Sequence, residues 1–188
     1  MGRALSEMTL EELWELFPIS LVPHNEQWIV YYNEMNDFLC NILSDYQIQR
    51  ISHIGSTAIQ GIWAKNIIDI LIETGSDEKM KKISEVIENN GFIRMSSDVN
   101  RVSFNRGYTE NGFEEKVYHL HLRQAGDNNE LYFRDYLNEH LQIAKEYEQL
   151  KLVLWKQYEY DRDGYTRAKS DFIKKWTLEA KRTYGNRY

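Results

Sequence analysis

Three groups of residues in the middle of the chain could carry chemistry: a glycine–serine pair, an isolated aspartate and a pair of histidines. Gly55 and Ser56 interrupt an apolar stretch, and Asp69 lies in the middle of the apolar run that follows. Because side chains alternate between the two faces of a strand, Asp69 shares a face with Leu71 and Glu73. Burying a carboxylate among isoleucines is costly unless a cation or hydrogen-bond donors meet it. We therefore expect a cation or hydrogen-bond donors to meet Asp69.

The Gly55–Ser56 pair offers a way to bind an anion beside that cation. Gly55 has no side chain, so its backbone can approach a ligand closely. Ser56 and Thr57 open a short helical turn, whose free N–H groups and hydroxyl groups can hold a phosphate. A phosphate cradle beside a metal-binding acid suits nucleoside triphosphate and Mg²⁺ chemistry. The alternative interpretation is that Ser56 only caps a helix and Asp69 only pairs with a nearby Lys or Arg.

The sequence YHLHL places His119 and His121 two residues apart in a predicted strand. Such residues share a strand face with Cα atoms ~7 Å apart, so both imidazoles can reach one metal ion. They can equally donate hydrogen bonds to a phosphate or serve as structural residues.

The elements that must position these residues follow from the hydrophobic pattern. Thr9 and Glu12 form a capping box for a first short helix, and residues 25–43 form a long amphipathic helix. Ser76 is expected to cap a helix that runs to Gly91. The pattern predicts strands at 47–53, 67–72, 92–96, 99–106 and 115–123, and helices at 129–140, 143–160 and 165–183.

Strands in the centre and helices at both ends predict an α+β fold. The length and the absence of a linker favour a single domain over residues 1–188. It would consist of N-terminal helices at 1–45, a sheet core with the site at 46–124, and C-terminal helices at 128–185.

Composition narrows the class of protein further. Apolar residues make up 42% and charged residues 28% of the 188 residues, and the net charge is −6. Lys and Arg are spread along the chain, which argues against a nucleic-acid-coating protein. Cys40 has no cysteine partner for a disulfide and is expected to be a small core residue of its helix. No segment has the length of a membrane span, so we expect a cytoplasmic protein, and the sequence allows a homo-oligomer.

The stretch HIGSTAIQGIWAKNIIDILI at 53–72 resembles the signature of the GrpB family (UPF0157), H-I-G-S-T-A-V-x-G-L-x-A-K-P-I-I-D-I. The similarity continues through nearly the whole chain. Further matching segments are LFPISLVPHNEQW near the N-terminus, RVSF at 101–104, YHLHL at 118–122, FRDYL at 133–137, YEQLK at 147–151 and YTRAKSDFI at 165–173.

The resemblance implies a nucleotidyltransferase-like fold, a mixed central β-sheet flanked by helices, as in DNA polymerase beta and kanamycin nucleotidyltransferase. Those enzymes follow a Gly-Ser turn with a strand whose Asp-x-Asp pair holds divalent cations. Gly55 and Ser56 match the turn and Asp69 matches the first acid, but Leu71 replaces the second. Glu73 lies roughly 13 Å from Asp69 along a strand, too far to share one ion.

The resemblance also places the strand of His119 and His121 near the third acid of the superfamily. Asp69 with both histidines would form a two-histidine, one-carboxylate set, which suits Mn²⁺, Fe²⁺, Zn²⁺ or Ni²⁺ better than Mg²⁺. The expected cofactor is a divalent metal, with Mg²⁺ or Mn²⁺ favoured by the family and a transition metal by the histidines. Asp69 and His121 are the expected catalytic residues, with His121 or His119 as a general base.

Several cations in the matching segments are candidates for phosphate binding. Arg can contact two phosphate oxygens at once, whereas Lys acts as a point charge. Lys65 and Arg101 are favoured, while Arg134 lies beside Asp135 and is equally consistent with a structural salt bridge. The full set of expected phosphate-binding cations is Lys65, Arg101, Arg134, Lys151 and Lys169.

The remaining histidines and several tyrosines are less specific. His53 either faces the same pocket or caps the turn, and His24 and His140 are expected on the surface. The tyrosines of the matching segments are expected in the core or at a pocket rim, where one could stack on a nucleobase; they are Tyr118, Tyr136, Tyr147 and Tyr165.

Three functions are consistent with these residues. The leading hypothesis is a metal-dependent transferase that moves a nucleotidyl group from a nucleoside triphosphate to an acceptor. The second is a non-catalytic module that binds a nucleotide or another phosphate-containing small molecule. The missing second acid favours that module, and some relatives are fused to dephospho-coenzyme A kinase, which hints at an accessory role. The third is metal-dependent hydrolysis of a phosphoester.

Overall fold

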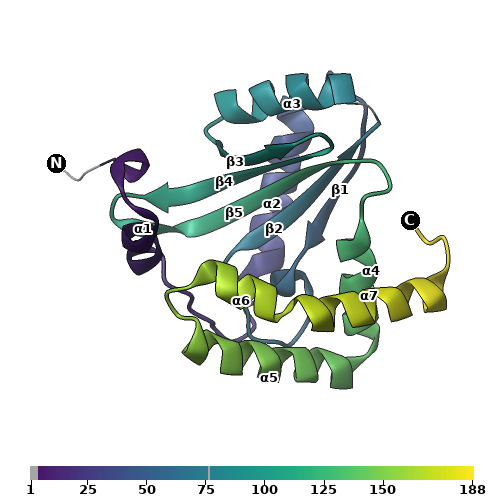
Figure 1. Cartoon of the computed structure of the whole chain (residues 1–188). Helices are drawn as coiled ribbons and strands as arrows, with labels where there is room; N and C mark the ends of the chain where they lie inside the picture. Colours follow the sequence, from purple (N-terminus) through teal and green to yellow (C-terminus); the bar gives the residue numbers. More distant parts are fainter. Residues whose placement is uncertain (1–3, 76) are drawn as a thin grey trace.

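The computed structural model describes residues 4–75 and 77–188. In these residues the strands are β1 (Ile48–Ile54), β2 (Ile68–Thr74), β3 (Ile93–Asp98), β4 (Arg101–Thr109) and β5 (Gly112–Gln124). The helices, shown in Figure 1, are η1 (Leu5–Glu7), α1 (Leu10–Leu16), α2 (Gln27–Ile42), η2 (Ser56–Ala58), α3 (Asp77–Asn89), α4 (Asn129–Glu139), α5 (Leu141–Gln157), α6 (Arg162–Ala168) and α7 (Ser170–Tyr184).

The strands form one mixed sheet in the order β1-β2-β5-β4-β3. β2 and β5 run parallel, whereas the other neighbouring pairs are antiparallel. In this register Asp69 lies opposite His119 on β5 and opposite Ile54 on β1, and Leu71 lies opposite His121. The two central strands therefore bring the isolated acid and both histidines to the same face.

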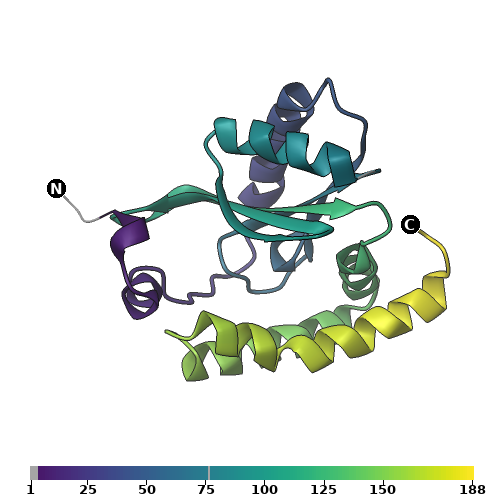
Figure 2. The same cartoon turned by 45° about the horizontal axis from the view of Figure 1, so that its top comes forward.

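The two faces of the sheet are covered by different helices. Figure 2 shows α2 and α3 on one side and α4 to α7 on the other. Ile68, Ile70 and Ile72 of β2 are buried in the core that includes α2 and α3. The alternate residues of the same strand point to the opposite face, where Leu71 is buried against Leu131 of α4. Asp69 therefore faces the C-terminal helices.

Most elements form where the sequence predicts them, including the Thr9–Glu12 capping box at the start of α1. The predicted single helix at 165–183 is wrong, because α6 and α7 are separate helices with Lys169 between them. The predicted helix at 143–160 ends at Gln157, and Asp161 then caps α6 by accepting a hydrogen bond from the Gly164 N–H at 2.7 Å.

Two further expectations concern single residues. Cys40 is not a core residue but exposed, because the buried stripe of α2 runs through Trp28, Met35 and Leu39 instead. The predicted helix cap Ser76 lies outside the described residues. Within the described part of the chain, no helix is both long and apolar enough to cross a membrane.

Candidate metal and phosphate site

Asp69 lies directly beside the Gly55 turn. Gly55 follows β1 and adopts φ +72° and ψ −173°, a combination that only glycine reaches readily. A Cβ atom at position 55 would lie 2.4 Å from Oδ2 of Asp69 and 3.0 Å from its Cβ and Cγ atoms. The glycine is therefore required twice, for the backbone turn and for the space that the carboxylate occupies.

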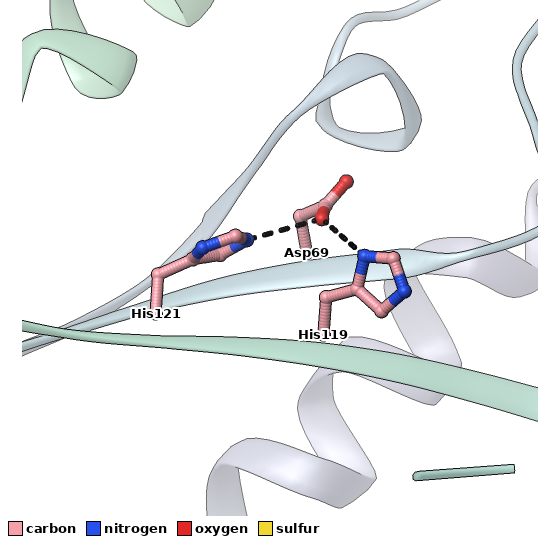
Figure 3. A group of neighbouring side chains, drawn as sticks. All are labelled: Asp69, His119 and His121. Atoms are coloured by element: carbon pink, nitrogen blue, oxygen red, sulfur yellow. Dashed lines mark hydrogen bonds and ion pairs between the residues drawn. The ribbon is translucent and has the colours of Figure 1, made fainter. Parts of the chain in front are cut away.

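The other carboxylate oxygen of Asp69 faces both histidines, as Figure 3 shows. Nδ1 of His119 lies 3.3 Å and Nε2 of His121 lies 3.2 Å from Oδ1 of Asp69. One potential ligand atom from each of the three residues lies within 4.8 Å of the other two. The three side chains thus converge on one point from two adjacent parallel strands.

Tyr108 orients one of these histidines. Its hydroxyl group lies 2.8 Å from Nε2 of His119, so the opposite ring nitrogen, Nδ1, is the one turned toward Asp69. Arg162 donates a hydrogen bond to the same hydroxyl at 3.1 Å. A metal-binding histidine is usually held in place by a hydrogen bond that its second ring N–H donates, and the Tyr108 hydroxyl oxygen can accept it.

The charges of these groups suit a metal ion. Burial opposes ionisation of Asp69, but the hydrogen bonds from His119 and His121 outweigh it and hold the pKa of the carboxyl group well below its usual range. Burial lowers the pKa of His119, which favours the neutral imidazole that binds metals. A carboxylate beside a neutral imidazole is a donor set for a divalent ion.

The spacing of the donors also fits one ion. Two atoms that each lie about 2.1 Å from a metal are at most about 4.2 Å apart. Both Asp69–histidine separations, 3.3 and 3.2 Å, meet this limit. Two nitrogens and one oxygen match Mn²⁺, Fe²⁺, Zn²⁺ or Ni²⁺ better than Mg²⁺, so these residues fit the expected divalent metal, although not the Mg²⁺ that the resemblance also favoured.

Glu73, the other acid on this face of β2, has a structural role. Its side chain is fully buried and accepts hydrogen bonds from the Gly126 N–H at 2.9 Å and from Asn128 at 3.0 Å. Arg50 lies 3.5 Å from its second oxygen. Glu73 therefore joins the end of β2 to the loop between β5 and α4, and is not part of the metal-binding group.

The turn after Gly55 opens into a cavity of about 1320 Å³, whose lining includes Ser56, Thr57 and Asp69. The Thr57 hydroxyl is occupied, because it donates to the Ile67 carbonyl at 3.1 Å. Nε2 of His53 lies 2.9 Å from the same hydroxyl. The His53 ring stacks on another ring of the core, and burial lowers its pKa to about 4. His53 thus supports the turn rather than lining the cavity.

Three of the predicted lysines line this cavity: Lys65, Lys151 and Lys169. The ammonium groups of Lys65 and Lys169 both lie over the ring of Tyr165, at 5.8 and 4.1 Å from its centroid. Lys151 is almost fully buried and donates to the Trp63 carbonyl. Burial, together with the charge of a neighbouring cation, lowers the pKa of Lys151 and Lys169 to about 7 and that of Lys65 to about 8.

The structure does not bring the two predicted arginines into the cavity lining. Arg101 is bound through two hydrogen bonds, both 2.7 Å, to Asp127. Arg134 donates to the His53 carbonyl at 2.8 Å and to Asp135 at 2.8 Å. Arg101 lies at the far end of its strand, opposite Arg123 rather than His119. Both guanidinium groups have structural partners, so the salt-bridge interpretation of Arg134 holds and the ligand role expected of Arg101 is not supported.

Tyr108, which contacts His119, and Arg162 were not anticipated from the sequence, and neither were the cavity cations Arg94, Lys174 and Lys181. Arg162 and Tyr108 both line the cavity and contact each other. Arg162 lies just before the segment YTRAKSDFI, and this proximity was the one local signal available. Tyr108 lies two residues beyond the predicted strand at 99–106, so its contact with His119 depends on the β4–β5 pairing.

The other histidines and tyrosines differ in whether they line the cavity. Tyr147 and Tyr165 line the cavity, and burial raises the pKa of Tyr147 to about 12. Tyr118 and Tyr136 are core residues outside the lining. The remaining two histidines, expected on the surface, are half-buried beside aromatic rings away from the cavity; they are His24, against Trp28, and His140, against Tyr136.

A mixed sheet in which a Gly-Ser turn faces an acid-bearing strand is the arrangement of the nucleotidyltransferase fold. The structure is similar, with a TM-score of 0.50 and 14% identity, to the Cid1 poly(U) polymerase H336N mutant bound to MgATP. That similarity covers 79% of this chain and 46% of the polymerase. At this identity it defines the fold alone.

Sequence comparison defines the family. Residues 18–179 match the family described as GrpB protein, and the chain belongs to the GrpB family. It is 33% identical over 179 residues to the UPF0157 protein YqkA of Bacillus subtilis (strain 168), covering 92% of this chain and 51% of that protein. It thus spans about half the length of that relative.

Two further relatives are matched over most of their length. The chain is 34% identical over 161 residues to the glutamate-rich protein GrpB of Alkalihalophilus pseudofirmus, covering 82% of this chain and 91% of that protein. The crystal structure of the conserved protein GrpB from Enterococcus faecalis superposes with a TM-score of 0.75 at 28% identity. It covers 88% of this chain and 99% of that structure.

Proposed function

We propose that this protein binds a nucleotide or another phosphate-containing small molecule together with a divalent metal ion, and transfers a nucleotidyl group to an acceptor. The observation that carries the proposal is the convergence of Asp69, His119 and His121 within 4.8 Å at the wall of a cavity that also contains Ser56. The proposal implies action in the cytoplasm, where nucleotides are made and used.

The charge of the cavity supports an anionic ligand. The protein as a whole carries a net charge of −6, yet among the described residues seven Lys and Arg line the cavity against three Asp and Glu. An excess of positive charge in a partly enclosed site attracts phosphate groups. The basic residues are Lys65, Arg94, Lys151, Arg162, Lys169, Lys174 and Lys181.

Each group of residues has a role in the proposed reaction. Asp69, His119 and His121 would hold the metal, which when bound acts as a Lewis acid on a phosphate oxygen. Lys65 and Lys169 would stabilise the negative charge that develops on the phosphate oxygens. His121 is the candidate general base in the alternative in which Asp69 and His119 alone hold the metal, because its Nε2 atom is then free to accept a proton and its side chain is 24% exposed.

A second candidate function is binding without reaction, and Leu71 favours it. Leu71 occupies the position of the second metal-binding acid of nucleotidyltransferases and is fully buried. On this face of the sheet three side chains could bind one metal ion, and position 71 provides no ligand for a second metal ion. On this alternative the protein recognises a phosphate-containing ligand as an accessory to another enzyme.

Release of pyrophosphate distinguishes these functions. Each nucleoside triphosphate is incubated with Mg²⁺ or Mn²⁺ and a pool of candidate acceptors, and wild type is compared with Asp69→Asn. The matched control is Asp98→Asn, an exposed aspartate outside the cavity lining. A transferase releases pyrophosphate, and Asp69→Asn slows the release by at least about a hundredfold, whereas the control does not.

The other outcomes decide between the alternatives. Release of inorganic phosphate without pyrophosphate would show hydrolysis of the terminal phosphoanhydride bond instead of nucleotidyl transfer, and release of phosphate from a phosphomonoester such as p-nitrophenyl phosphate would show hydrolysis of a phosphoester. If no product forms with any metal, the transferase proposal is wrong, and thermal denaturation then tests binding. A nucleotide at 100 times its Kd adds about 2.7 kcal/mol to the free energy of unfolding. If neither nucleotides nor inorganic phosphate shift the midpoint, the binding proposal is wrong as well.

A further inference from the structure

The cavity has an apolar wall that the proposed function does not use. Leu10, Leu13, Trp14 and Phe17 line it and are spaced i, i+3, i+4 and i+7 along α1 and its C-cap. Such a stripe normally packs against a protein core. No residue within α1 itself is buried and Leu10 is 52% exposed, whereas Phe17 at the C-cap is packed and only 3% exposed. The apolar face of α1 is therefore turned toward the cavity.

Side chains from two other elements extend this wall. Ile93 and Met95 of β3 and Leu178 of α7 also line the cavity, and each is more than half exposed. Figure 2 shows α1 and α7 on the same side of the sheet. Single exposed apolar residues are ordinary, but a group that converges on one cavity marks a binding surface. The apolar wall is defined here as these residues of α1, β3 and α7.

The apolar wall is continuous with the metal-binding residues. The ring of Phe17 lies 4.8 Å from the ring of Tyr108, whose hydroxyl group contacts His119 at 2.8 Å. A molecule that extends past Tyr108 would thus pass from the charged part of the cavity to the apolar wall. The volume of about 1320 Å³ exceeds the roughly 300–1,000 Å³ typical of ligand pockets, so the cavity has room beyond a phosphate group.

We propose that the ligand of this cavity is amphipathic, with a phosphate-bearing head at Ser56 and the cavity lysines and an aliphatic body along the apolar wall. This inference rests on the proposed function and names the class of its substrate or acceptor. The charges favour this orientation, because Lys65 and Lys169 interact with Asp69 beside the Ser56 turn. Arg94, Lys174 and Lys181 also line the cavity, from β3 and α7, so an anionic head near the apolar wall is the opposite orientation that the variants below test. A small phosphorylated amphiphile, rather than a second protein chain, matches both surfaces within one cavity.

A series of alkyl phosphates tests this proposal. Inorganic phosphate and ethyl, butyl, hexyl and octyl phosphate, each below its micelle-forming concentration, are titrated into the full chain by calorimetry. The affinity is expected to rise with chain length, by up to about fourfold for each methylene group that is buried. Trp14 lines the cavity, so the longer members should also change tryptophan fluorescence. Trp14→Phe should abolish that change.

Two variants test where the alkyl chain and the phosphate head of the ligand bind. Met95→Asp, at a residue that is 57% exposed and so can change without disturbing the core, should lower the ratio of octyl phosphate to inorganic phosphate affinity at least tenfold. Val153→Asp is the matched control, at a 65% exposed residue of α5 outside the cavity lining, and should leave the ratio as in wild type. Lys169→Met should weaken every member of the series by a similar factor.

The failures of the two proposals can be told apart. Lysine-dependent binding of inorganic phosphate without any effect of chain length would overturn the amphipathic ligand and leave the proposed function standing. Absence of binding by every member of the series would overturn the amphipathic ligand, and the proposed function falls with it only if nucleotides also fail to shift the melting temperature. If octanol binds as tightly as octyl phosphate, the pairing of head and body is wrong. If Met95→Asp instead abolishes a dimer seen by sedimentation, the apolar wall is a contact between copies of the chain.

Discussion

Replacing Gly55 with alanine should remove metal binding while leaving the protein folded. The new Cβ atom would lie 2.4 Å from Oδ2 of Asp69, and restoring an ordinary contact of about 3.5 Å requires a shift of about 1 Å. Metal–ligand distances tolerate only about 0.2 Å, so the carboxylate can no longer share one ion with His119 and His121. The expected loss of affinity for Mn²⁺ or Zn²⁺ is at least about a hundredfold, measured by calorimetry.

The same substitution also strains the backbone. An alanine at φ +72° and ψ −173° costs about 1–3 kcal/mol, which lowers the melting temperature of the metal-free protein by roughly 2–12 °C for a chain of this size. Strain alone could weaken binding indirectly, so a control for strain is needed. Gly61 provides it, because it has φ +70° and its added Cβ would meet nothing within 4 Å.

The pair of variants separates the clash from the strain. Gly61→Ala should lower the melting temperature but bind metal like wild type, whereas Gly55→Ala should lose both stability and metal. A folded Gly55→Ala protein that binds Mn²⁺ within about threefold of wild type would refute the argument that the glycine makes space for the carboxylate. Wild type that binds none of Mn²⁺, Zn²⁺ or Ni²⁺ would refute the metal site itself.

Three further predictions follow from individual contacts. Tyr108→Phe removes the hydroxyl that contacts His119 and should weaken metal binding by about 10–100-fold, with little change in melting temperature; an unchanged affinity would contradict the orienting role. Glu73→Gln leaves buried donors without their charged acceptor and should cost about 3 kcal/mol of unfolding free energy in urea, while metal affinity stays unchanged. Burial lowers the pKa of Lys151 and Lys169 to about 7, so both side chains lose their charge as the pH rises above 7. Sulfate keeps its charge in this range and should therefore bind more weakly between about pH 7 and pH 9. For each lysine that contacts it, its affinity should fall by up to about tenfold per pH unit. Lys169→Met should flatten that profile, and a sulfate affinity independent of pH would show that these lysines do not bind the anion.

The order and type of the elements were accessible from the sequence because they depend on local patterns. The capping box of α1 and the apolar stripe of α2 involve residues a few positions apart, and both are present. The errors occurred where local signals compete. A helical pattern runs through 165–183, but Asp161 caps α6, which begins at Arg162, and the helix is interrupted at Lys169 before α7 begins. The exposed position of Cys40 depends on which side of α2 packs against the sheet.

The sequence by itself determined the family, the Gly-Ser turn and the chemical types of the donors, Asp69 and the two histidines, because each is carried by a short motif. Tertiary structure decided which charged residues reach the cavity. The sequence favoured Arg101 over Lys169 as a phosphate-binding residue, yet Arg101 is paired with Asp127 and Lys169 lines the cavity. Register and helix packing bring together residues more than a hundred positions apart, and no local pattern encodes that distance.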